Sequence, residues 1–158
     1  IGPSSSGKST LINKWIEDKL IRKNDICFAY KYSWIKKYTK RIFHFNLLTT
    51  YEKYNTYNFS IDKNLKSILK LKKISVYILY ANQDIVENRI KKRKFNEYEI
   101  LRKDIQYKTK EKLEISKELN YNKLYNSFIQ LLTEYKIKYT IIDTNNHNYK
   151  EISNDKIF

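Results

Sequence analysis

Glycine, proline and cysteine are almost missing from this sequence of 158 residues. It contains two glycines, one proline and one cysteine, and it has no methionine. Because both glycines and the proline lie within the first seven residues, no Gly- or Pro-rich linker separates two domains. The single thiol, Cys27, cannot form an internal disulfide, so nothing in the composition indicates secretion. We therefore expect one domain over residues 1–158.

Long hydrophobic runs are lacking too. The apolar runs fall far short of the roughly 20 residues that cross a membrane, and no signal peptide is visible. We therefore expect a cytoplasmic protein with no membrane partner. The chain begins at Ile1, and its first motif begins at Gly2, where a strand usually precedes. We interpret the chain as an N-terminally truncated fragment, cut just inside its first strand.

Positive charge is in excess, with a formal net charge of +15 and a pI near 9.7. Such a balance is typical of proteins that bind nucleic acid. It is equally typical of an AT-rich genome, which favours lysine over arginine, and here 27 lysines accompany only five arginines and two alanines. We favour the compositional explanation. Nucleic acid remains a possible partner but not the favoured one.

Alternating apolar patterns predict a chain that switches between helix and strand. Strands separated by helices imply parallel pairing with right-handed crossovers, and continuously apolar strands imply burial on both faces. We therefore expect a three-layer α/β/α sandwich. The predicted helices cover Thr10 to Ile21, Ile61 to Leu71, Asn82 to Lys94, Tyr107 to Leu119 and Tyr121 to Lys136, and the predicted strands cover Ile26 to Tyr30, Arg41 to Leu48, Ile74 to Ala81 and Tyr139 to Asp143.

The first ten residues carry the clearest motif. Gly2-Pro3-Ser4-Ser5-Ser6-Gly7-Lys8-Ser9-Thr10 satisfies the pattern G-x-x-x-x-G-K followed by Ser or Thr, which is typical of phosphate-binding loops. Both glycines of the chain stand at the two positions that this motif requires, which argues against an ordinary serine-rich turn. We expect residues 2–10 to bind the phosphates of ATP or GTP.

The chemistry of phosphate binding explains each part of this motif. Gly2 and Gly7 let the backbone curl so that successive N–H groups point inward, and the following helix adds its positive N-terminal end. Lys8 is expected to reach the β- and γ-phosphates. The hydroxyl of Ser9 is expected to bind a Mg²⁺ ion that keeps several waters.

The segment GPSSSGKSTLI resembles the loop of guanylate kinase and of the wider group of P-loop nucleotide and small-molecule kinases. The resemblance implies a parallel five-stranded sheet, a lid over the phosphates, and ATP with Mg²⁺ as the phosphoryl donor. A weaker resemblance over Val76 to Lys94 implies that Arg89 and Arg93, on one helix face, close over the transferred phosphoryl group. A solvated helix face is the alternative. The segment YTIIDTNN resembles the last strand of these kinases and the following loop, which packs against the base of the nucleotide.

Other features limit the functional prediction. The N-K-x-D and D-x-x-G motifs of GTPases are absent, and the GMP-gripping stretch of guanylate kinase has no counterpart, so GMP is not the predicted acceptor. The acidic residue that usually activates the acceptor is missing as well. His44 is the candidate base, although a packed core histidine is the alternative, and Asn46 or Glu52 are candidates for holding metal-bound water.

We therefore predict an ATP-dependent kinase of a small molecule, with a nucleoside, nucleotide or phosphorylated metabolite as acceptor. Aromatic residues between Tyr30 and Tyr57 are expected to face that acceptor. The alternative explanation is that they cluster by coincidence, because the chain has 15 tyrosines. The alternative is a nucleotide- or nucleic-acid-binding module with little turnover, and a nucleic-acid end kinase would combine both activities. The predicted catalytic residues are Lys8, Arg89, Arg93 and His44.

Overall fold

The computed structural model describes residues 1–3, 5–28, 42–71, 73–92, 104–146 and 149–153, with side chains throughout except at 27, 28 and 104–109. In this part of the chain the α-helices are α1 (Lys8–Glu17), α2 (Leu47–Tyr54), α3 (Lys63–Leu69), α4 (Gln83–Lys92), α6 (Asp104–Glu118) and α7 (Tyr121–Glu134). Two short 3-10 helices are η1 (Lys23–Asp25) and η3 (Phe59–Ile61). The strands are β1 (Ile26–Phe28), β2 (Ile42–His44), β3 (Val76–Tyr80), β4 (Tyr139–Asp143) and β5 (Lys150–Ile152).

Side-chain caps explain where several helices begin. Asn46 accepts a hydrogen bond from the Leu48 amide at 3.2 Å and so starts α2 directly after β2. The Asp62 carboxylate caps α3 through the amides of Asn64 and Leu65, and Asn120 caps α7. The predicted strand over Arg41 to Leu48 is therefore wrong in its last part, because β2 ends at His44 and Asn46 caps a helix.

The predicted five-stranded parallel sheet is wrong. The described strands form a two-stranded parallel sheet, β1–β2, and a three-stranded mixed sheet in the order β3–β4–β5, in which β5 is antiparallel to β4. A parallel neighbour needs a crossover of a dozen or more residues, whereas the connection from Asp143 to Lys150 is far shorter. The predicted three-layer α/β/α sandwich, which was built on that parallel sheet, is therefore wrong as well.

Residues Ile1 and Gly2 lie between β3 and the start of α2, and they hydrogen-bond to both. The Leu79 amide of β3 donates to the Ile1 carbonyl at 2.8 Å, and the Leu47 amide donates to the Gly2 carbonyl at 3.1 Å. Gly2 also forms an isolated parallel bridge with Asn46. The chain before the loop is therefore held from both sides.

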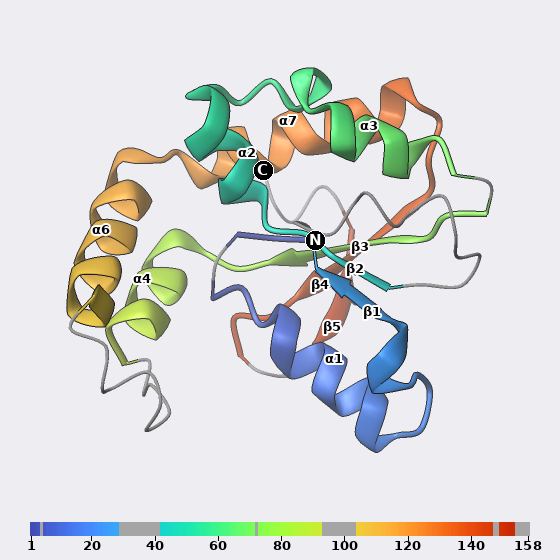
Figure 1. Ribbon diagram of the computed structural model, residues 1–158, viewed down its shortest axis with the longest axis horizontal. Coiled ribbons are helices and arrows are strands. Elements are labelled where there is room, and N and C mark those ends of the chain that lie inside the picture. The colour runs from blue at the N-terminus through green and yellow to red at the C-terminus, as the bar shows by residue number, and fades with distance from the viewer. Residues whose placement is uncertain (4, 29–41, 72, 93–103, 147–148, 154–158) are drawn as a thin grey trace.

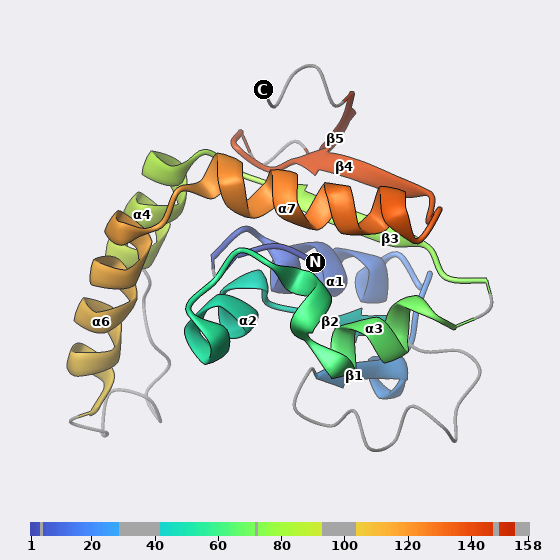
Figure 2. The ribbon, with the colours of Figure 1, turned by 90° about the horizontal axis from the view of Figure 1, so that it is seen from above.

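Helices lie on both faces of the β3–β4 pair. Helices α2, α3 and α7 lie on one side and α1 lies on the other, while α4 and α6 pack against each other at one end of the molecule (Figures 1 and 2). Of these elements, the sequence patterns predicted α1, α3, α4, α6 and α7 within a few residues, and β4 at its observed bounds. They missed α2 and β5. Within the described ranges, no helix is long and apolar enough to pass through a bilayer.

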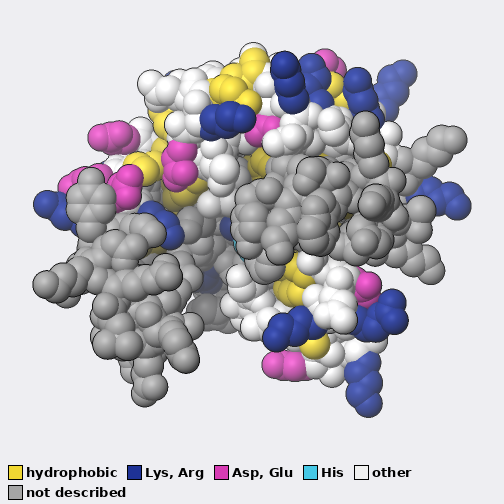
Figure 3. Space-filling view, viewed as in Figure 1, with side chains coloured by type: hydrophobic (Ala, Val, Ile, Leu, Met, Phe, Trp, Pro, Cys, Tyr) yellow, Lys and Arg dark blue, Asp and Glu magenta, His cyan; other side chains and the backbone are white. Residues whose placement is uncertain are grey.

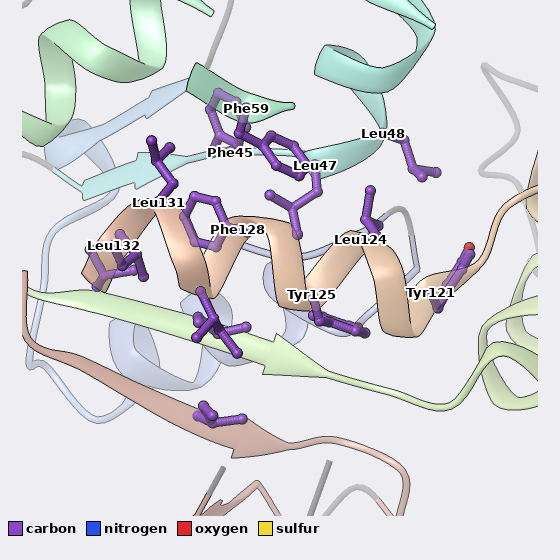
Figure 4. Close-up of a cluster of buried hydrophobic side chains, with 14 of the residues drawn as sticks. Phe45, Leu47, Leu48, Phe59, Tyr121, Leu124, Tyr125, Phe128, Leu131 and Leu132 are labelled. Carbon is purple, nitrogen blue, oxygen red and sulfur yellow. The ribbon is translucent and has the colours of Figure 1, made fainter. Parts of the chain in front are cut away.

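The main hydrophobic core lies between α7 and the strands. Apolar residues of α7 recur at helical spacing, and Leu124, Tyr125, Phe128 and Leu132 are fully buried. Figure 4 shows these side chains beside Phe45, Leu47, Leu48 and Phe59 from the β2–α2 region and η3. On the other face a smaller cluster of Leu11, Leu79 and Ile142 packs α1 against β3 and β4, with Trp15 and Tyr149 at its border.

Candidate phosphate-binding site

The carboxyl ends of several parallel segments meet at one edge of the structure. Gly2 runs parallel to the chain at Asn46, β3 runs parallel to β4, and the loop of residues 2–7 leaves this edge to begin α1. Ligands of open α/β sheets bind outside the carboxyl ends of their strands. The predicted phosphate loop therefore stands at the edge where a ligand of such a fold is expected.

The loop turns sharply through two residues with left-handed backbone conformations. Ser5 has a φ of 59°, and Gly7, which precedes α1, has a φ of 88°. The Ser6 amide donates to the Pro3 carbonyl at 3.3 Å and so closes the turn. Gly7, the N-cap residue of α1, provides no side-chain acceptor for the first-turn amides of this helix. These amides are the groups that bind anions at helix N-termini.

Glycine is required at position 2 by the closeness of its neighbours. A Cβ atom there would lie 2.5 Å from the Ser6 hydroxyl oxygen and 2.8 Å from the Leu79 carbonyl oxygen of β3. The carbonyl is backbone and cannot move away as a flexible side chain would. Gly2 thus lets the loop pass directly against β3.

Lys8 is folded into the loop. Its ammonium nitrogen donates to the Gly2 carbonyl at 2.9 Å and also to the Pro3 carbonyl. The residue is only 7% exposed. Burial lowers the pKa of Lys8 from 10.5 to about 7, because an ammonium loses hydration that two carbonyl dipoles replace only in part. An anion at this position would favour the charged form again.

The serines of the loop lie in different surroundings. The Ser6 side chain is fully buried, and its hydroxyl oxygen has no hydrogen-bond partner among the residues that the structure describes. Ser9 and Thr10 are exposed on the first turn of α1. Ser4 lies outside the described residues. Buried polar groups are normally paired, so the Ser6 hydroxyl is a donor that the described part of the chain does not satisfy.

The candidate metal ligand, Ser9, fits Mg²⁺ only in a limited way. Its exposed position leaves the hydroxyl accessible, but one hydroxyl is a small part of an octahedral shell. Among the residues that the structure describes, no three His, Cys, Asp or Glu side chains gather as a metal site would require. The chain therefore suits a Mg²⁺ ion whose remaining ligands are phosphate oxygens and waters, the mode that this ion usually adopts.

His44 ends β2 and lies half-buried near the loop. Burial and the positive charge of Lys8 lower the pKa of His44 from 6.5 to about 4. The imidazole is therefore neutral at pH 7, and its interaction with Lys8 brings two of the predicted catalytic residues into one neighbourhood. Asn46, a candidate for holding metal-bound water, instead caps α2, and Glu52 is exposed on that helix.

Arg89 is engaged by the chain that follows β4. Its guanidinium donates to the Thr144 hydroxyl at 3.3 Å, to the Thr144 carbonyl, and to the Asn145 carbonyl at 3.4 Å. These bonds join α4 to the carboxyl end of β4. Arg93, its predicted partner over the phosphates, lies outside the described residues.

Thr144, Asn145 and Tyr149 carry further contacts at this edge. The Asn82 amide after β3 donates to the Asn145 side-chain oxygen at 2.8 Å, and the buried Thr144 donates to the Tyr80 carbonyl. Tyr149 lies against Gly7 of the loop. The resemblance of YTIIDTNN had indicated a functional loop here, but Tyr149 is one of 15 tyrosines and nothing in its local sequence distinguishes it.

Comparison with known proteins adds no relative. No protein-family model, no curated protein and no solved structure matches this chain.

Proposed function

We propose that the protein transfers a phosphoryl group from ATP, bound with Mg²⁺, to a small-molecule acceptor. The observation that supports this best is the closed loop of residues 2–8, with a left-handed Gly7 before the first-turn amides of α1 and with the Lys8 ammonium drawn inside it. A buried cation beside the first-turn amides of α1 is an arrangement that a polyphosphate would complete. The chemical class of the acceptor is a nucleoside, a nucleotide or a phosphorylated metabolite.

Each residue has a defined part in this proposal. Two N–H groups of Lys8 already bond to the carbonyls of Gly2 and Pro3, and the third meets a β- or γ-phosphate oxygen. The α1 amides and the Ser6 hydroxyl donate to further phosphate oxygens. Ser9 holds Mg²⁺, which neutralises charge that develops on the phosphates. Arg93, with Arg89, closes over the transferred group, since such transfer depends mainly on positioning and electrostatics.

The proposed base is the weakest part of this mechanism. His44 is neutral and can accept a proton, but a pKa of about 4 makes it a poor base at pH 7. Because phosphoryl transfer has a loose transition state, a weak base slows the reaction without preventing it. We therefore propose His44 as the group that receives the acceptor proton, at a modest rate.

The low basicity of His44 also favours a second candidate, a nucleotide-binding module with little turnover. The two candidates predict different responses to the acceptor. In the first, a small molecule accelerates ATP consumption and becomes phosphorylated. In the second, ATP binds but no metabolite accelerates its consumption. A nucleic-acid end kinase would instead show consumption that depends on oligonucleotides.

A screen in two stages tests the proposal. Thermal unfolding with ATP, GTP, ADP and tripolyphosphate, each with and without Mg²⁺, identifies the donor, because a ligand at 100 times its Kd stabilises the native state by about 2.7 kcal/mol. ADP release is then measured with nucleosides, nucleotides, phosphorylated metabolites and oligonucleotides. Phosphorylation of one small molecule, lost in Lys8→Ala, is the expected result. A protein that no nucleotide or polyphosphate stabilises would refute the proposal.

Positive charge does not by itself favour the nucleic-acid alternative. On the face shown in Figure 3, Lys and Arg side chains are spread over several elements, with Asp and Glu side chains among them. A protein that binds nucleic acid through many phosphate contacts loses several decades of affinity as salt rises. We expect non-specific oligonucleotide binding at physiological salt, with a Kd in the range of about 10⁻⁴ to 10⁻⁶ M.

A further inference from the structure

Tyr149 lies in contact with the phosphate loop, although 142 positions separate it from Gly7. A Cβ atom placed on Gly7 would be 3.0 Å from the Tyr149 hydroxyl oxygen, and 3.4 and 3.6 Å from two carbons of its ring. The phenol therefore fills the space that a side chain at position 7 would need.

The fold brings Tyr149 there through the β4–β5 hairpin. Lys150, the next residue, pairs with Asp143 at the carboxyl end of β4, so Tyr149 comes just beyond the edge where the loop begins. Its ring packs at the border of the cluster formed by Leu11, Leu79 and Ile142. The side chain thus extends from an apolar anchor under α1 to the turn that precedes this helix.

Tyr149 itself has a left-handed backbone conformation. Its φ is 46°, in the region that a bulky residue rarely adopts. Four described residues away from the loop also have positive φ: Lys19, Asn55, Lys73 and Lys136. A strained backbone conformation persists only where surrounding contacts hold the residue, and such conformations are common at functional sites. The contact with Gly7 and the packing on the apolar cluster are the contacts that hold Tyr149.

We propose that Tyr149 is a positioning residue, whose ring holds Gly7 in its left-handed conformation and keeps the first-turn amides of α1 directed at the phosphates. The identity of the ligand in this inference rests on the proposed function, whereas the restraint of Gly7 by Tyr149 does not. The turn depends on one glycine, which moves freely between conformations unless a neighbour restricts it. A ring anchored on α1, β3 and β4 supplies that restriction, and a loop ordered before binding loses less entropy when the anion arrives.

A double-mutant cycle without ligand tests the contact. Gly7→Ala combines backbone strain with a clash against the Tyr149 hydroxyl, and Tyr149→Phe removes the hydroxyl while keeping the ring. We expect the fall in Tm caused by Gly7→Ala to be smaller by roughly 3 °C in the Tyr149→Phe background. Amide hydrogen exchange at residues 7–10 should accelerate in Tyr149→Ala and stay as in the wild type in Tyr149→Phe.

Ligand affinity gives the second test, with tripolyphosphate and ATP–Mg²⁺ as probes. Tyr149→Ala should weaken both by about tenfold, and Tyr149→Phe should restore affinity, because the ring supplies the restraint. Tyr135→Ala is the matched control: Tyr135 is also half-buried and packs on the main core after α7. It should lower Tm while leaving both affinities unchanged.

The outcomes separate this inference from the proposed function. Additive effects in the cycle, together with unchanged exchange at residues 7–10 in Tyr149→Ala, would overturn the positioning role. Unchanged affinity in Tyr149→Ala, with a wild type that binds both probes, would also overturn it and leave the proposed function intact. A wild type that binds neither probe would refute the proposed function, while the cycle and the exchange data would still decide whether Tyr149 holds Gly7.

Discussion

The ammonium nitrogen of Lys8 lies 2.9 Å from the carbonyl oxygen of Gly2. Lys8 is the first residue of α1, so this hydrogen bond links the start of the helix to the start of the phosphate loop. This bond and the one to Pro3 bury the charge among backbone dipoles. Removing an ion from water is costly unless a partner of opposite charge is present. The free protein therefore holds Lys8 in a state that an anion would stabilise.

Replacing Lys8 with alanine tests its contact with phosphate. The substitution removes the charge that meets the β- and γ-phosphates, so ATP affinity should fall at least tenfold, or about 1.4 kcal/mol. The Tm without ligand should change little, because the cost of burying the ammonium offsets its two hydrogen bonds. Titration calorimetry and thermal unfolding measure the two quantities. Lys14→Ala, exposed on the same helix, is the control. A folded Lys8→Ala protein with unchanged ATP affinity would contradict the assignment.

Binding of a polyphosphate should take up a proton above pH 7. In the free protein the pKa of Lys8 is about 7, and a bound anion raises it because opposite charge favours the ammonium. Affinity should therefore fall as pH rises above 7, by up to about tenfold per pH unit. Calorimetry at pH 8 to 9, in buffers with different ionisation heats, measures the uptake while phosphate ionisation is complete. Lys8→Met should abolish it, and uptake that persists in this variant would assign the proton to another group.

Protonation of His44 should destabilise the folded state in acid. Its pKa is about 4 when folded, against an ordinary value of 6.5, so the unfolded state binds more protons between these values. The free energy of unfolding should therefore rise with pH through this window, and this contribution is lost as pH falls from 6.5 towards 4. Urea unfolding at several pH values measures the slope, and His44→Gln should reduce it. An equal slope in both proteins would show that His44 does not titrate as proposed.

Lys8 and His44 should also titrate as neighbours. Lys8→Met removes a positive charge that lowers the pKa of His44, so that pKa should rise. NMR titration of the imidazole measures it, in a His147→Gln background that leaves one histidine signal. A pKa that does not respond to Lys8→Met would mean that the two side chains do not interact.

Arg89 and Arg93 should behave differently when each is replaced by alanine. Arg89 bonds to Thr144 and Asn145, so Arg89→Ala should destabilise the fold by about 1.5–3 kcal/mol, the range for hydrogen bonds to charged groups. Arg93→Ala should lower turnover more than ATP affinity, if the group acts mainly in the transition state. Unfolding and steady-state kinetics check both. Arg93→Ala with full turnover would refute its role over the phosphates.

Much of the local structure follows from the sequence. Strand β4 was predicted at its observed bounds, since YTIID is apolar and β-branched, and α7 was predicted from apolar residues at helical spacing. The loop motif indicated both positions where the backbone needs glycine, and Gly2 and Gly7 each have a contact or a dihedral angle that explains the requirement. Such signals are local, because a cap, a turn or a periodic face depends on residues close in the chain.

Strand order and the surroundings of the loop were decided by tertiary structure. The short polar strand β5 has no pattern of its own and forms because Lys150 to Ile152 pair with β4, which makes the sheet mixed. In the same way, the lowered pKa of Lys8 follows from burial. The contact of Tyr149 with Gly7 joins segments at opposite ends of the chain. Periodicity determines which residues face a core, but pairing between distant segments depends on which surfaces pack together, and that is settled only when the whole chain has folded.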